Sequence, residues 1–137
     1  MDWLDITPES GDIIRTKVSF YYHYGIFVSE HEVIQFGLPD NVFRPASEIA
    51  VLSSDIYTFI GDGNLEVGQP SKEEKKKMRP KKEIVKLAQS RIGEGGYDIL
   101  HNNCEHFVNE CVFGESYSSF LDEARARIRS KLNKSQD

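Results

Sequence analysis

The stretch Phe20-Tyr21-Tyr22-His23-Tyr24-Gly25-Ile26-Phe27-Val28 is dense in aromatic and β-branched residues, which pack well on a pleated sheet. After the polar interruption Ser29-Glu30-His31-Glu32, a similar composition resumes in Val33-Ile34-Gln35-Phe36-Gly37. Two such runs separated by a short polar segment are typical of a β-hairpin. The sequence therefore predicts two antiparallel strands over residues 20–37.

The spacing of apolar residues in this hairpin separates its two faces. Side chains alternate between faces along a strand, so His23 falls on the face opposite the main apolar set, and Gln35 falls on that same face. A loop centred on Ser29 would place Gln35 directly opposite His23, and a slip of one residue would separate them. We therefore predict that His23 and Gln35 share a face. The apolar set comprises Tyr22, Tyr24, Ile26, Val28, Ile34 and Phe36.

Outward from the hairpin, the first half of the chain favours strands and the second half favours helices, which is typical of an α+β fold. The halves are joined by a basic segment, residues 70–82, which we interpret as a solvated loop or loosely helical linker. Further strands are predicted at residues 11–17, 42–44 and 53–60, and helices at residues 84–92, 104–114 and 119–134, the last of them amphipathic.

Length and composition limit the classes of protein to consider. The 137 residues predict a single globular domain over 1–137, with 39% hydrophobic and 28% charged residues. No apolar run approaches the roughly 20 residues that span a bilayer, and the acidic start Met1–Asp5 does not resemble a secretory signal. The net charge of −5 argues against nucleic-acid binding. We expect a cytoplasmic protein with reduced thiols and no cofactor.

Cys104 is the first candidate for chemistry, because it lies where a helix is predicted to begin, after Asn102 or Asn103 as the cap. The unpaired N–H groups and the positive end of a helix dipole are expected to lower the pKa of such a thiol. The second cysteine, Cys111, lies about two turns further along and is flanked by Val112 and Phe113. We interpret Cys111 as a buried structural thiol.

A reactive thiol needs a base, and His23 is the best candidate because a strand would hold its ring rigidly. Gln35 could orient that ring, as the third group of a catalytic triad does. His106 follows Cys104 by two positions and would point away from it on a helix. Two other interpretations stay open: Cys104 and His23 can be ordinary structural residues, or Cys104 can join a zinc site with His101, His106 and Cys111.

The chain resembles the lecithin:retinol acyltransferase family and its phospholipase/acyltransferase relatives. The resemblance rests mainly on Asn103-Cys104-Glu105-His106-Phe107-Val108 and on His23-Tyr24-Gly25-Ile26-Phe27-Val28. Gly11-Asp12-Ile13-Ile14 and Tyr97-Asp98-Ile99-Leu100 extend it, so that it covers roughly residues 11–114.

The resemblance implies a circularly permuted papain-like fold, in which an antiparallel sheet bearing the histidine packs against a helix bearing the nucleophile. It implies an acyltransferase or acyl-ester hydrolase, and the phospholipase/acyltransferase relatives imply a phospholipid substrate. Cys104 would be the nucleophile that forms a thioester, His23 the base and acid, and Gln35 the orienting group. The family commonly has a second histidine where this chain has Gln35, whose carbonyl can still accept a hydrogen bond from His23.

Two other functions use the same residues differently. A papain-like amidase or peptidase would use the same Cys104–His23 pair, and a non-catalytic interaction domain would keep only the fold. The residues Glu110-Cys111-Val112-Phe113-Gly114 also depart from the Leu-Arg-Tyr-Gly that usually follows the cysteine motif in the family. Transient membrane contact through the basic segment and the C-terminal helix is conceivable, although we expect the apolar stripe of that helix to pack on the core.

Overall fold

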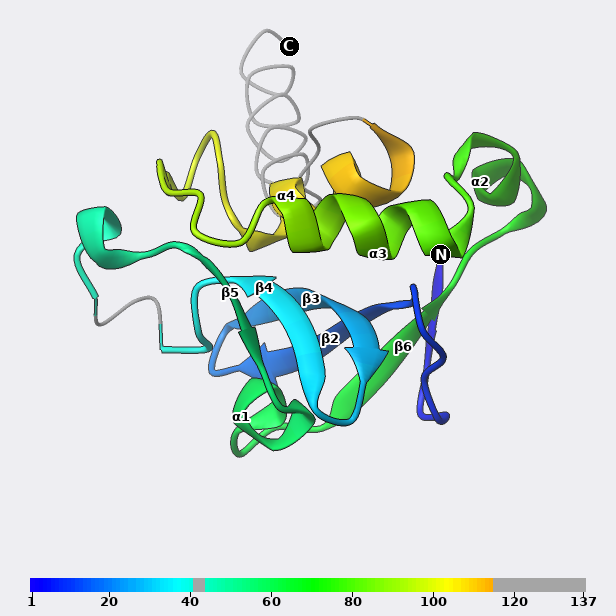
Figure 1. Ribbon diagram of the computed structural model, residues 1–137. Helices are drawn as coiled ribbons and strands as arrows, with labels where there is room; N and C mark the ends of the chain where they lie inside the picture. Colours follow the sequence, from blue (N-terminus) through cyan, green and yellow to red (C-terminus); the bar gives the residue numbers. More distant parts are fainter. Residues whose placement is uncertain (41–43, 115–137) are drawn as a thin grey trace, which may run out of the picture.

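The computed structural model describes residues 1–40 and 44–114, in which a six-stranded antiparallel sheet carries helices on both faces (Figure 1). The strands lie in the order β1-β6-β2-β3-β4-β5. They are β1 (Asp2–Leu4), β2 (Ile13–Val18), β3 (Tyr21–Ser29), β4 (Glu32–Phe36), β5 (Val51–Ser54) and β6 (Leu65–Gln69). The helices are α1 (Ile56–Ile60), α2 (Lys72–Lys77), α3 (Lys81–Ser90) and α4 (Cys104–Phe113), with a short 3-10 helix η2 (Ala46–Glu48). The predicted α+β class is confirmed.

Both faces of the central strands are covered. On one face, α3 and α4 pack against β3 and β4, and on the other face lies α1 (Figure 1). The larger core, on the α3/α4 face, includes Tyr24, Ile26, Ile34, Phe36, Ile84, Phe107 and Val108. The smaller core, on the α1 face, consists of Ile14, Val33, Phe59 and Val67. Side chains on both faces in the middle of these two strands are therefore buried, and they include the polar residues His23 and Gln35.

The β3–β4 hairpin has a different register from the predicted one. Gln35 pairs with Gly25, and the register shifts between Phe27 and Ser29, where Ser29 pairs with Glu32. The position of Gln35 directly opposite His23, expected for a loop centred on Ser29, was therefore wrong by two residues, because the turn is centred between Glu30 and His31. A shift of two equals the side-chain period of a strand, so the shared face was predicted correctly.

Gly25 lets α1 approach the sheet at this point. A Cβ atom on Gly25 would lie 2.7 Å from the ring of Phe59 and 3.1 Å from Val33. With hydrogen there instead, Phe59 packs directly over β3, and its ring centroid lies 5.3 Å from that of His23. A glycine in the strand thus allows an aromatic side chain to cover the polar residues of this face.

Several element predictions need correction. The strand predicted at 53–60 ends at Ser54, because Asp55 caps α1 by accepting a 2.7 Å hydrogen bond from the Thr58 N–H. Strands β1 and β6 were not predicted, and the basic segment 70–82 contains α2 and the first turn of α3. The predicted helices at 84–92 and 104–114 correspond to α3 and α4. The predicted helix at 119–134 and most of the strand at 42–44 lie outside the described residues.

Candidate active site

His23 lies on β3 and is completely buried. Its Nε2 lies 2.7 Å from Oε1 of Gln35. A carbonyl oxygen can only accept, so Nε2 carries the proton and donates it to Gln35, which leaves the lone pair of the neutral ring on Nδ1. Nδ1 has no hydrogen-bond partner among the described residues, although it is shielded from water. Since buried polar atoms are normally paired, this base is available for a proton from another group.

Gln35 is held in turn by the end of β5. It is fully buried, and its Nε2 donates to Oγ of Ser54 at 2.5 Å. The Ser54 hydroxyl donates to the carbonyl oxygen of Asp55 at 2.9 Å. His23 and Gln35, predicted to share a face, are therefore joined in a longer series of hydrogen bonds, and the sequence analysis did not identify Ser54.

Cys104 is the first residue of α4 and is 6% exposed. Of the two predicted caps, Asn103 is the N-cap: its Oδ1 accepts from the N–H groups of Glu105 and His106, both at 3.0 Å. Its side-chain amide also donates to the carbonyl of Ile99 at 2.9 Å, which ties the preceding loop to the helix. The start of α4 is thereby fixed without any contribution from the Cys104 side chain.

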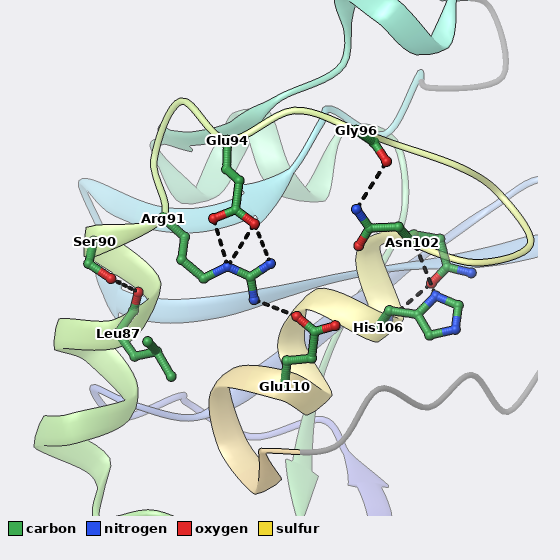
Figure 2. Close-up of polar contacts among 9 residues, drawn as sticks. Leu87, Ser90, Arg91, Glu94, Gly96, Asn102, His106 and Glu110 are labelled. Atoms are coloured by element: carbon green, nitrogen blue, oxygen red, sulfur yellow. Dashed lines mark hydrogen bonds and ion pairs between the residues drawn. The ribbon is translucent and has the colours of Figure 1, made fainter.

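His106 completes this cap (Figure 2). Its Nδ1 accepts a 3.0 Å hydrogen bond from the Asn103 N–H, so Asn103 and His106 form a reciprocal capping box. With Nδ1 engaged in this way, His106 acts on the helix start. That a histidine other than His106 serves Cys104 stays a prediction.

The thiol of Cys104 lies at the backbone of β3. The N–H of Tyr24 interacts with this thiol and favours its ionised form. The last β3–β4 pair is Gly25–Gln35, so the two strands are no longer paired at His23 and Tyr24. The Cys104 thiol thus meets β3 at Tyr24, the residue after His23, where β3 is paired with β2 and not with β4.

Burial controls the pKa values of both groups. It raises the pKa of Cys104 to about 11, which outweighs the opposite effect of the N–H groups of Tyr24, Cys104 and Glu105. It lowers the pKa of His23 to about 4, although the hydrogen bond with Gln35 and the backbone of Gly37 favour the charged ring. The prediction of a lowered thiol pKa is therefore wrong, and both groups are neutral at pH 7.

The chain is similar over most of its length to known proteins. A model of the lecithin retinol acyltransferase family matches residues 6–117, which include all three candidate site residues. The chain belongs to the lecithin retinol acyltransferase family.

Characterised family members are distant in sequence. The chain is 25% identical to lecithin retinol acyltransferase of Mus musculus over 88% of its length, and covers 63% of that relative. It is 27% identical to phospholipase A and acyltransferase 3 of Homo sapiens, over 81% of this chain and 74% of the relative. Phospholipase A and acyltransferase 2 of Homo sapiens gives the same values. The chain spans less than two thirds of the mouse lecithin retinol acyltransferase.

Other residues considered for the site lie elsewhere in this family member. His31 is exposed at the hairpin turn, and His101 is 79% exposed beside Asp98, with 3.4 Å between Nδ1 and Oδ1. Cys111 is fully buried, and burial raises its pKa to about 11, in line with a structural thiol. Within residues 1–40 and 44–114, no three His, Cys, Asp or Glu side chains are placed to hold a metal ion, so His101, Cys104, His106 and Cys111 do not form the zinc site considered above.

No helix within the described residues has the length and apolar character needed to cross a bilayer.

Arg91 anchors the helix that carries Cys104 (Figure 2). Its guanidinium forms ion pairs with Glu110 at 2.7 Å and with Glu94 at 2.8 Å. It also lies 4.9 Å from the ring centroid of Phe107 on α4. This one side chain therefore links the end of α3 and the following loop to the middle of α4.

Burial of neutral His23 makes the fold sensitive to acid. In the unfolded chain the imidazole takes up a proton near its ordinary pKa of 6.5, whereas in the folded chain it resists protonation down to about 4. The free energy of unfolding should therefore decrease as the pH falls from 6.5 to 4, by about 3 kcal/mol in total from this one group. Urea unfolding of wild type and His23→Gln across this range measures the difference.

The difference between wild type and His23→Gln removes the contribution of other titrating groups to the pH dependence. The pH slope of His23→Gln should be flatter below pH 6.5, and the two slopes should agree above it. His31→Gln, which changes an exposed histidine, should keep the wild-type slope. Equal slopes for wild type and His23→Gln would contradict a neutral buried His23.

Proposed function

We propose that this chain is a cysteine-dependent acyltransferase or acyl-ester hydrolase that acts on phospholipids through a thioester acyl-enzyme. Cys104 is the nucleophile, His23 the general base and acid, and Gln35 the residue that orients His23. The family of the chain and the names of its relatives support the class of reaction. The order of a sheet histidine followed by a helix cysteine supports a circularly permuted papain-like arrangement.

One observation carries the assignment of roles. The Nδ1 atom of His23 is buried and without a hydrogen-bond partner among the described residues, while Nε2 is bound by Gln35. The Cys104 thiol lies at the backbone of the very next residue, Tyr24. From a rigidly held imidazole base and a thiol at the backbone of the next residue, we infer nucleophilic catalysis by cysteine.

Acylation begins from a neutral pair. With a thiol pKa of about 11 and an imidazole pKa of about 4, the thiolate–imidazolium pair is disfavoured before substrate binds. Proton transfer from Cys104 Sγ to His23 Nδ1 therefore accompanies attack of the sulfur on the ester carbonyl carbon. The C–O bond to the lysophospholipid then breaks, and His23 returns the proton to the leaving oxygen, which leaves an acyl thioester on Cys104.

Deacylation repeats these steps with a different nucleophile. Water, or an amine or alcohol acceptor, gives its proton to His23 Nδ1 and attacks the thioester carbonyl. The C–S bond breaks and the Cys104 thiol regains its proton. Water as the acceptor makes the chain a hydrolase, and an amine or alcohol makes it a transferase.

The negative oxygen formed at each step needs donors. In the first turn of α4, the N–H groups of Glu105 and His106 are bound by the Asn103 side chain, and that of Phe107 bonds to the Asn103 carbonyl. The N–H of Cys104 lies before them and favours negative charge at its own sulfur. We assign this N–H as one oxyanion donor.

Exposed apolar side chains near the site support a lipid substrate. Phe20 is 77% exposed and precedes Tyr21, whose pKa is raised by burial and by negative charge at Cys104. Ile99 and Leu100 are 60% and 54% exposed, and the Ile99 carbonyl is bound by the helix cap Asn103. Large apolar side chains at such exposure gain from contact with lipid.

Removing one of these side chains should separate lipid contact from chemistry. Phe20→Ser should lower the rate of phospholipid cleavage in vesicles about tenfold, because part of the binding free energy of an aromatic ring is lost. The rate with a short-chain monomeric ester should stay within about twofold of wild type. Tyr57→Ser is a matched control, since Tyr57 is 69% exposed on α1 but binds Glu30 at the other end of β3. Equal losses with both substrates would contradict a role in lipid contact.

Trapping the thioester tests the proposed function. The Cys111→Ala chain, which keeps a single thiol, is mixed with phosphatidylcholine in vesicles, quenched in acid and analysed by intact mass. We expect the mass of one acyl group, removed by hydroxylamine and absent in Cys104→Ala. Release of lysophospholipid by Cys104→Ala, or turnover of an amide but no ester, would overturn the proposal.

A further inference from the structure

We propose that Ser54 is a positioning residue that sets the tautomer of His23 through the amide of Gln35. This inference concerns the site of the proposed function, and it rests on that function for its effect on catalysis. It follows from the direction of three consecutive hydrogen bonds. Ser54 would touch neither substrate nor thiol in this role.

The donor and acceptor of each of these hydrogen bonds follow from the last one, between Ser54 and Asp55. The Asp55 carbonyl can only accept, so the Ser54 hydroxyl, 2.9 Å away, donates its single proton to this carbonyl. The Ser54 oxygen is then left as an acceptor, and the group 2.5 Å from it must be the N–H side of the Gln35 amide. The Gln35 carbonyl therefore faces His23 Nε2 at 2.7 Å, and the ring proton must lie on Nε2.

The opposite arrangement would inactivate the base. If the Gln35 amide turned by half a rotation, its N–H would point at His23 Nε2 and its oxygen at Ser54. Nε2 would then have to accept, and the ring proton would move to Nδ1. A protonated Nδ1 cannot take the proton of Cys104, so the choice between two amide orientations is also a choice between a competent and an incompetent histidine.

The fold holds Ser54 in the required place. Ser54 pairs with Val33 in the β4–β5 ladder, so its side chain shares a face with Gln35. Asp55, whose carbonyl receives the Ser54 proton, is fixed as the N-cap of α1 through Thr58. Phe59 from the same helix covers the His23 ring. The β5–α1 junction thus sets both the packing and the protonation of the base.

The test reads the tautomer directly. Histidine labelled with ¹⁵N reports which ring nitrogen of His23 is protonated, and His23→Gln identifies the resonances. In wild type at pH 7.5, we expect Nδ1 at the shift of an unprotonated nitrogen and Nε2 at that of a protonated one. In Ser54→Ala, the shift of Nδ1 should move toward the protonated value and that of Nε2 away from it.

Two further variants control for structure. Ser54→Thr keeps a hydroxyl and should restore the wild-type shifts. Ser53→Ala changes the neighbouring exposed serine, which faces the other side of β5, and should leave them unchanged. Urea unfolding of each variant establishes that it is folded. Wild-type His23 shifts in a folded Ser54→Ala chain would overturn the proposal, as would a wild-type His23 protonated on Nδ1.

Activity gives a second readout that separates this proposal from the function itself. Ser54→Ala should lower kcat about tenfold, the effect of one neutral hydrogen bond, with KM within about twofold. Ser54→Thr should recover most of kcat. If wild type cleaves no acyl ester, the proposed function fails. The ¹⁵N measurement still tests whether Ser54 sets the tautomer of His23. If kcat is unchanged although the tautomer shifts, Ser54 has no part in catalysis.

Discussion

Replacing Cys104 by alanine is expected to lower acyl transfer by about 10⁴-fold or more, since the reaction then lacks its nucleophile. The fold should remain intact, because α4 is capped by Asn103 and His106 and the Cys104 side chain takes no part in that cap. The measurement is the rate of lysophospholipid release, together with the urea midpoint of the variant. Cys111→Ala, which changes the other buried thiol, should keep its activity within about tenfold.

The double variant sharpens this prediction. His23→Ala should lower the rate by a comparable factor, because a thiol with a pKa of about 11 is a poor nucleophile without a base. Combining Cys104→Ala with His23→Ala should cost little more than either change alone, since the two residues act as one unit. Multiplicative losses would indicate that the residues act independently and would contradict the proposed pair.

Replacing Arg91 by methionine is expected to lower the free energy of unfolding by about 3 kcal/mol. The Arg91 side chain is only 15% exposed, and its loss leaves the Glu110 carboxylate half-buried against α3 without its cation. The contact of the guanidinium with the Phe107 ring is lost as well. Urea unfolding at pH 7 measures the change.

A second substitution identifies the cause of that loss. Glu110→Gln in the Arg91→Met background should restore part of the stability, because it removes the uncompensated carboxylate. Lys86→Met removes a positive charge from an exposed position of the same helix and should change stability by less than about 0.5 kcal/mol. A similar effect of Arg91→Met and Lys86→Met would show that net charge, not the buried cluster, matters.

Local patterns in the sequence predicted the central part of the fold and of the site. Alternation along the hairpin placed His23 and Gln35 on one face, and the structure brings them to 2.7 Å. Side-chain capping chemistry placed the start of α4 at Cys104, with Asn103 as one of two candidate caps. These features depend on residues close together in the chain or on a two-residue period, which a sequence displays directly.

Features that depend on packing between distant segments could not be predicted in this way. The pairing of Gln35 with Gly25 depends on where the turn is centred and on the register shift between Phe27 and Ser29. Ser54 was missed because the strand it ends was extended through Asp55, which hid the register of β5 against β4. The raised thiol pKa of Cys104 reflects burial against β3, and the local sequence motif does not indicate how deeply the thiol is buried.

The amide at position 35 has a consequence for how the site responds to acidity. An amide neither gains nor loses a proton over the range in which proteins remain folded, so the hydrogen bond that Gln35 accepts from His23 has the same polarity at pH 5 and at pH 9. A second imidazole there would add its own titration near neutrality and would couple it to that of His23. With glutamine, the protonation of His23 can follow a single-site curve, and any bell shape in the pH–rate profile must come from other groups.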